Sequence, residues 1–152
     1  MIDRERFRDA LAGWASGVTV IAYRTDERVV ATTVSAFTSL SAAPPLVLIA
    51  LGPNATVRPF LQAGRRFTVN ILAAEQHRLA TIYADPFPVG PDPFPPSGEP
   101  VIAGALASLQ CTVERVEEGG DHAVVIAAVD SAAWRDGAPL IRYRRKYHTL
   151  DG

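Results

Sequence analysis

Apolar positions at the start of the chain recur with the spacing of one face of a helix. Four of them follow the i, i+3, i+4, i+7 rule: Phe7, Ala10, Leu11 and Trp14. Asp3 stands just before them, where its carboxylate can accept hydrogen bonds from free N–H groups of the first turn. The pattern predicts a helix that begins after Asp3 and ends at Gly17.

Beyond residue 17 the pattern changes to that of β-strands, with turn-forming residues between apolar or alternating segments. Strands are predicted at residues 18–23, 29–37, 46–51, 67–72, 109–114, 122–129 and 140–150. Two further short helices are expected, one from Thr56 to about Gly64 and one over residues 74–84. The proline-rich segment 85–100 is expected to form an irregular loop.

The order of these elements indicates the fold class. Strands do not alternate with helices as in parallel α/β proteins, and no internal repeat is present. The expected fold is mainly β, an antiparallel barrel with short peripheral helices, because closing the sheet removes most free strand edges. The length of 152 residues suits one domain over residues 1–152.

Composition restricts the surroundings in which the protein works. The formal net charge of -1 argues against a nucleic-acid partner. No apolar segment has the length of a membrane span or the character of a signal peptide. The single cysteine, Cys111, fits a reducing compartment and lies in an alternating strand pattern, which favours a buried packing role. We expect a cytoplasmic protein without membrane contacts.

A hydroxyl-rich segment lies at the end of the predicted strand that begins at residue 29. It contains five hydroxyl side chains, those of Thr32, Thr33, Ser35, Thr38 and Ser39. Hydroxyls can donate and accept hydrogen bonds, so such a segment suits the polar edge of a flavin ring. Threonine and serine also suit an exposed β-surface, which is the simpler interpretation of the composition alone.

Two shorter segments add candidate ligand contacts. Asn54 and Thr56 stand at the start of a predicted helix, where free N–H groups attract a phosphate, although plain N-capping explains them equally well. His122 follows a predicted turn, where it can stack on a nicotinamide or simply be an exposed hairpin residue. The chain has no zinc-ligand spacing, phosphate-binding P-loop or nucleophile elbow, so we expect no metal and a chemistry supplied by a cofactor.

Taken in order, these segments resemble the flavin reductase-like domain family, which has the FMN-binding split barrel fold. The resemblance extends from residue 7 to 148 and rests on six groups of residues: Phe7, Ala10 and Leu11 with Gly17–Val20; Thr33–Phe37 with Ser39 and Ser41; Pro44–Leu48; Phe67 with Val69–Leu72; Gly120–His122; and Lys146–His148. It implies an antiparallel split β-barrel.

The resemblance also implies a function and a set of site residues. The chain would be an NAD(P)H:flavin oxidoreductase that transfers hydride from NADH or NADPH to FMN or FAD, and would supply reduced flavin to a partner monooxygenase. His122 would meet the nicotinamide, and the chain would form a homodimer. Flavin would contact Thr33, Val34, Ser35, Ser39, Ala50, Leu51, Asn54, Thr56, Tyr83, Ala84, Lys146 and Tyr147.

The sequence departs from the family pattern at three places: the proline-rich loop is shorter, Arg145 replaces a usual glycine, and Asn54 with Thr56 replaces a serine-threonine run. Two alternative functions also fit the residues. One is a non-catalytic flavin-binding protein, and the other is an enzyme that uses tightly bound flavin on a dedicated small molecule. The sequence distinguishes neither NADH from NADPH nor FMN from FAD.

Overall fold

The computed structural model of the protein describes residues 1–150. In this range the elements are, in chain order, α1 (Arg4–Leu11), β1 (Ser16–Gly17), β2 (Thr19–Arg24), β3 (Val29–Val34), β4 (Phe37–Ala42), β5 (Pro45–Leu51), the 3₁₀ turn η1 (Arg58–Phe60), β6 (Arg66–Ile71), the 3₁₀ turn η2 (Ala74–Gln76), α2 (His77–Tyr83), β7 (Ala107–Gly119), β8 (His122–Trp134), β9 (Leu140–Tyr143) and β10 (Lys146–Thr149).

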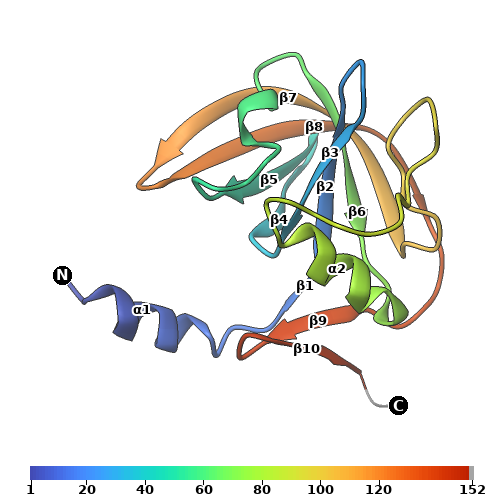
Figure 1. The fold of residues 1–152 in the computed structure, drawn as a ribbon. Coiled ribbons are helices and arrows are strands. Elements are labelled where there is room, and N and C mark those ends of the chain that lie inside the picture. Colours follow the sequence, from blue (N-terminus) through green and yellow to red (C-terminus); the bar gives the residue numbers. More distant parts are fainter. Residues whose placement is uncertain (151–152) are drawn as a thin grey trace.

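Seven strands form one antiparallel sheet in the order β3-β2-β6-β7-β8-β5-β4 (Figure 1). The sheet curls around a core, and the expected mainly β, antiparallel barrel is confirmed. Its two edge strands, β3 and β4, are consecutive in the chain and are joined through Ser35 and Ala36. The barrel is therefore split at this connection, where no strand ladder closes it.

The side-chain alternation of β5 shows how the sheet separates its two faces. Val47, Ile49 and Leu51 lie inside the barrel and are at most 5% exposed. The alternate residues Leu48 and Ala50 point to the outer face and are partly exposed. Because successive side chains of a strand point to opposite faces, a residue pattern that builds the core also presents a second row outside it.

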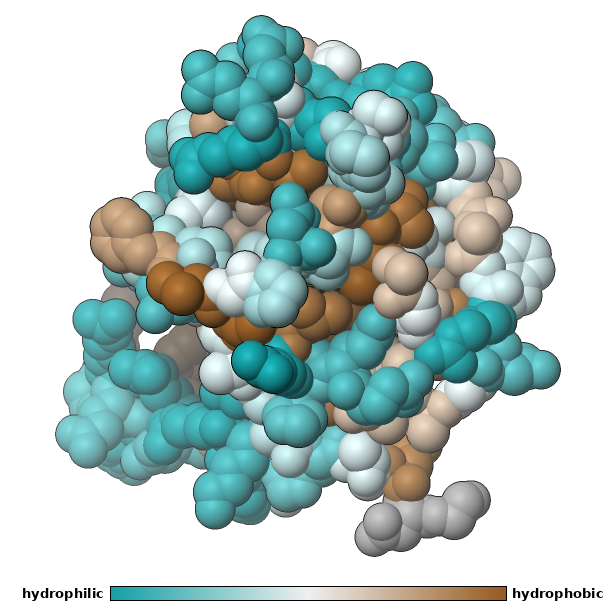
Figure 2. Space-filling view, turned by 45° about the vertical axis from the view of Figure 1, so that its right-hand side comes forward, coloured by the Kyte–Doolittle hydropathy of each residue, from teal (hydrophilic) through white to brown (hydrophobic). Residues whose placement is uncertain are grey.

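A second core cluster lies outside the barrel, between the sheet and the segment that contains α2 and the long loop. Tyr83 of α2 packs against Phe94 of the loop, with ring centroids 5.8 Å apart. Arg24 of β2 donates to the carbonyls of Pro95 and Gly98 and ties the loop to the barrel. On this side of the molecule a hydrophobic band lies between hydrophilic regions (Figure 2). The expected loop at residues 85–100 is confirmed, and so is the helical segment 74–84.

The first predicted helix and the strand at 29–37 were both too long. The helix ends at Leu11, because Ser16 and Gly17 pair with β9 as strand β1. The strand ends at Val34. This residue pairs with Thr19, the first residue of β2, so β2 offers no partner for the residues after Val34. These boundaries depend on long-range pairing, which the local pattern does not contain.

The helix predicted from Thr56 to Gly64 is wrong. Only one 3₁₀ turn forms, and no side chain caps it. The Thr56 hydroxyl instead donates to the carbonyl of Ala31 and shares a 2.9 Å hydrogen bond with Thr32 Oγ1. Thr56 thus fastens this turn to β3, and the helix terminus expected for anion binding is not formed.

The last predicted strand, 140–150, is a hairpin of β9 and β10. With β1 it makes a small three-stranded sheet beside the barrel (Figure 1). Arg144 and Arg145 form the turn in left-handed backbone conformations, with φ of 47° and 63°. Asparagine and glycine are the usual residues of such a turn, so two arginines gave no turn signal.

Cys111 is fully buried in the barrel, as the alternation predicted. Burial, assisted by the charge of Asp130, raises the pKa of its thiol to about 12. The thiol therefore stays protonated at neutral pH and serves packing. Within residues 1–150 no helix is both long and apolar enough to cross a membrane.

Candidate functional site

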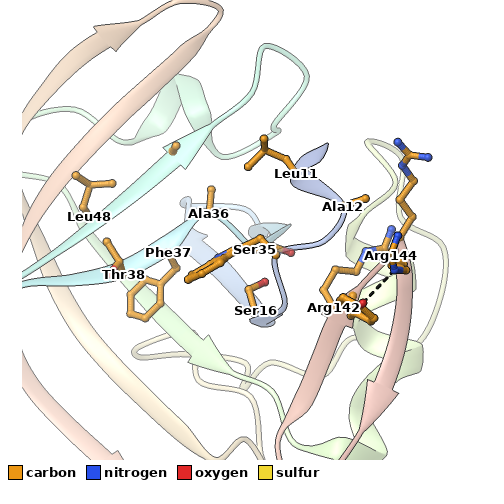
Figure 3. A pocket seen from close by; sticks show the side chains of 14 residues that line it. Leu11, Ala12, Ser16, Ser35, Ala36, Phe37, Thr38, Leu48, Arg142 and Arg144 are labelled. Atoms are coloured by element: carbon orange, nitrogen blue, oxygen red, sulfur yellow. Dashed lines mark hydrogen bonds between the residues drawn. The ribbon is translucent and has the colours of Figure 1, made fainter. Parts of the chain in front are cut away.

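A cavity of about 540 Å³ opens at the split of the barrel (Figure 3). Four parts of the chain line it: the segment from the end of α1 to β1, the β3–β4 connection with the start of β4, the outer face of β5, and the end of β9 with the β9–β10 turn. A smaller adjoining cavity of about 150 Å³ shares Ser35 and Phe37 with it. The site thus lies where the sheet leaves its edges unjoined.

One wall of this cavity is apolar. Phe37, Leu48 and Ala50 line it from β4 and β5, and Leu11 and Trp14 line it from the N-terminal arm, the segment 4–15 that carries α1. Leu48, Thr38, Phe37 and Ala36 lie together on one side in Figure 3, with Ser16 and Ser35 between them and the arginines. A flat aromatic ring with polar atoms along one edge fits an apolar wall beside hydroxyls.

The opposite wall is cationic. Arg142, Arg144 and Arg145 line the cavity, together with Tyr143. The Arg144 Nε donates to the Tyr143 hydroxyl at 3.0 Å, and its guanidinium lies 5.3 Å from the centre of that ring. The cavity therefore combines an apolar surface with a positively charged one.

The residues predicted on β3 and β4 are only partly brought to this cavity. Ser35 lines it, whereas the Thr33 hydroxyl donates to the carbonyl of Ala80 in α2. The Val34 side chain belongs to the barrel core. Ser39 lies exposed on β4, next to Thr38, which does line the cavity. Contacts of flavin with Thr33 and Val34 would have to involve their backbone groups.

Of the residues predicted at and after the end of β5, only some line the cavity. Ala50 lines the cavity, and its N–H donates to the carbonyl of Ala36, which extends the β4–β5 pairing by one residue. Leu51 points into the core. Asn54 is exposed on the turn that follows, and Thr56 is held against β3. Their contact with a flavin phosphate stays a prediction.

His122 lies beside this turn, at the start of β8. A side chain on Gly52 would come within 3.6 Å of His122 Nε2, so the imidazole and the turn are immediate neighbours. His122 Nδ1 is 2.6 Å from Asp121 Oδ1, and this hydrogen bond is the main cause that lowers the pKa of Asp121. Arg58 donates to the Asp121 carbonyl and fastens the turn to the β7–β8 hairpin.

The remaining predicted residues lie away from the cavity at the barrel split. Tyr83 is buried at the end of α2 and Ala84 follows it; burial, and then the charge of Asp92, raises the pKa of Tyr83. Lys146 is exposed at the start of β10. Tyr147 borders a separate cavity of about 320 Å³. The guanidinium of Arg142 lies over its ring, and burial raises the pKa of Tyr147.

Sequence reasoning missed several lining residues. Phe37 and Leu48 were assigned to strands without a ligand role, and Trp14 was placed on a helix. Arg142 and Arg144 belong to a short basic stretch of the sequence, but nothing local shows that they face a cavity. Only the outward positions of β5 offered a signal, since an apolar side chain on an exposed face needs something to cover it.

Residues 11–151 match the flavin reductase like domain. The chain belongs to that family. It is 36% identical over 152 residues to the reductase component of 4-hydroxyphenylacetate 3-monooxygenase from Thermus thermophilus, with 97% of each chain covered. It is 38% identical over 139 residues to an NADH-dependent FAD reductase from Streptomyces globisporus, covering 86% of this chain and 76% of that protein.

Solved structures of this family have the same fold. The flavin reductase PheA2 superimposes with a TM-score of 0.86 at 32% identity, covering 99% of this chain and 100% of that one. The Streptomyces globisporus NADH:FAD oxidoreductase SgcE6, in complex with NAD and FAD fragments, gives 0.87 at 32% identity, covering 98% and 93%. The resemblance found in the sequence and its split-barrel expectation are thereby confirmed.

Proposed function

We propose that this flavin reductase family member uses NADH or NADPH to reduce FMN or FAD and delivers the reduced flavin to a monooxygenase. The observation that carries the proposal is the cavity at the barrel split, with its apolar wall, its hydroxyls and its cationic wall. The relatives named as NADH-dependent FAD reductase, FMN reductase and monooxygenase reductase component support it.

The residues of the cavity fit a flavin. Phe37, Leu48 and Ala50 offer an apolar surface for the ring, and Ser35 offers a hydroxyl at its polar edge. No carboxylate lines this cavity within residues 1–150, so nothing there repels the negative charge of a reduced flavin or of a phosphate. When bound, the flavin supplies the redox chemistry, and the protein supplies binding, orientation and exclusion of water.

We propose that His122, which lies at the start of β8 beside the turn after β5, orients the nicotinamide. Its imidazole is held by Asp121 on one side and faces the turn after β5 with its Nε2. With Nδ1 engaged by the carboxylate, the ring orientation is set, and Nε2 is left for a ligand. Holding two rings in contact is a large part of what an enzyme contributes to hydride transfer, since it removes the entropy loss of their encounter.

The direct test is to mix the purified protein with NADH or NADPH and with riboflavin, FMN or FAD, and to follow absorbance at the nicotinamide band. We expect consumption of at least one nicotinamide that depends on free flavin. His122→Ala should raise KM for the nicotinamide about tenfold, the effect of losing one hydrogen bond to a ligand, and leave the flavin Kd unchanged.

His77→Ala is the matched control, because His77 borders a different cavity and should leave both constants unchanged. Flavin binding without any nicotinamide consumption would contradict the proposal and favour a flavin-sequestering protein. A yellow protein that ignores added free flavin would instead favour tightly bound flavin acting on another substrate.

The homodimer expected from the family also belongs to this proposal. Helix α1 stands apart from the barrel (Figure 1), and none of its residues is buried. Its apolar side chains Phe7 and Leu11 are 52% and 51% exposed, and Trp14 after it is 76% exposed. A monomer rarely leaves such an apolar stripe in water, and a second copy of the chain would cover it beside the cavity.

The mass in solution tests the dimer. We expect light scattering to give twice the chain mass for the native protein. Trp14→Glu combined with Phe7→Glu should shift the protein toward the monomer, because a charge in an apolar interface is poorly tolerated. Val89→Glu is the control, since Val89 is 88% exposed on the long loop. A monomeric native protein would remove this part of the proposal. A cytoplasmic location stays a prediction.

A further inference from the structure

The cationic wall of the cavity stands out from the charge of the whole chain. The chain has a formal net charge of -1, yet three arginines and no acidic residue line this cavity within residues 1–150. Positive charge gathered in a concave, partly apolar site raises the local potential, because field lines are concentrated there. The wall is thus suited to an anionic part of a ligand.

The backbone of the β9–β10 turn is strained at the two arginines. Left-handed conformations of non-glycine residues cost about 1 kcal/mol or more each, and they persist only where the surroundings hold them. Here the Arg144 N–H donates to the carbonyl of Ala12, and the Arg145 guanidinium forms a 2.6 Å ion pair with Asp9. These two contacts hold the turn against the N-terminal arm, which lines the cavity. Glycine or asparagine at either arginine position would relieve the backbone strain.

The guanidinium groups keep donors for a ligand. Arg142 stacks on Tyr147 at 4.6 Å, and Arg144 uses only its Nε on Tyr143. Neither forms a salt bridge with a carboxylate in the part of the chain that the structure describes, and Arg145 has one such partner, Asp9. Guanidinium binds phosphate oxygens through two parallel hydrogen bonds, which makes arginine a favoured phosphate ligand.

We propose that Arg142, Arg144 and Arg145 form a subsite for the diphosphate of a dinucleotide, which rests on the proposed function of the cavity. The apolar wall would take a ring, and the cationic wall the diphosphate that follows it. The diphosphate can come from the flavin, as FAD, or from the nicotinamide dinucleotide. Both carry the same chemical group, so the experiment must separate the two sources.

Two double variants separate charge from backbone conformation. R144N/R145N removes both charges and introduces asparagines, which adopt the left-handed backbone conformation readily. R144K/R145K keeps both charges but loses the planar guanidinium groups, which can donate two parallel hydrogen bonds. R115N is the matched control, because Arg115 is an exposed arginine of β7 whose salt bridge is with Glu117. Thermal unfolding should show that the asparagine variant is folded.

The measurement is an equilibrium fluorescence titration with FAD, riboflavin and NADH, which requires no turnover. For R144N/R145N we expect about tenfold weaker binding of FAD, of NADH or of both, and a change below about twofold for riboflavin, which has no phosphate. The lysine variant should bind with an affinity between those of the native protein and the asparagine variant, because it keeps the charges and loses the parallel hydrogen bonds. Added salt should weaken native binding of the affected dinucleotide more than it weakens binding to the asparagine variant.

The affected ligand identifies the source of the diphosphate. Weakened FAD binding assigns the subsite to the flavin, and weakened NADH binding assigns it to the nicotinamide dinucleotide. Unchanged binding of both, or equal weakening of FAD and riboflavin, would overturn the proposal. Because this readout is binding, it is independent of the nicotinamide consumption that tests the proposed function.

Discussion

Replacing Ala50 by tryptophan is expected to weaken flavin binding about a hundredfold, an effect at the upper end of those caused by overfilling a packed site. Ala50 lies on the outer face of β5 and lines the cavity, opposite the cationic wall. An indole there would occupy the space proposed for the flavin ring. Fluorescence titration with FMN, FAD and riboflavin measures the loss, and nicotinamide consumption should fall in parallel.

Ala132→Trp provides the matched control, because Ala132 is an exposed residue of β8 and the change in volume is identical. Its flavin affinity should equal that of the native protein. Far-UV circular dichroism and thermal unfolding should show that both variants keep the barrel. If a folded Ala50→Trp variant binds flavin with native affinity, the ring does not lie in this cavity.

Replacing Asn70 by leucine is expected to lower the free energy of unfolding by about 3–5 kcal/mol, the sum expected for several buried polar groups left without partners. Asn70 is fully buried on β6. Its Oδ1 accepts from the N–H of Ile102 and the hydroxyl of Ser108, and its Nδ2 donates to the carbonyls of Val20 and Pro100. Leucine has nearly the same size and can replace none of these bonds.

Urea unfolding measures this loss, and Asn54→Leu is the control at an exposed position, where a change below about 0.5 kcal/mol is expected. Because two partners of Asn70, Pro100 and Ile102, lie at the end of the long loop and just after it, limited proteolysis should also cut residues 85–106 faster in Asn70→Leu. A loss of stability below about 1 kcal/mol would show that the amide is not the anchor of this segment.

The sequence predicted the strands better than their ends. The segments 18–23, 46–51 and 67–72 lie within one residue of β2, β5 and β6, because alternation and apolar runs are local properties. The end of the first helix and the break after Val34 were missed, since both depend on pairing with distant strands. The hairpin at Arg144 and Arg145 was missed because two arginines imitate a continuous strand.

The candidate site was predicted in outline and not in its details. Ser35 and Ala50 were named and line the cavity, whereas the side chains of Thr33, Val34 and Leu51 turn to other contacts. A hydroxyl-rich segment can be recognised in a sequence, but the face to which each side chain points follows from the register of the strand. Residues two positions apart share a face only as long as the strand continues.

The sequence by itself determined the antiparallel barrel, the buried thiol and the family of this protein, because periodicity and ordered motifs are written along the chain. Only the tertiary structure decided where the cavity lies and that arginines form one of its walls. Ser16, Ala50 and Arg142 are far apart in the sequence and meet where the sheet is left open. That meeting depends on which edges remain unpaired after folding, a property of the whole sheet and of no single segment.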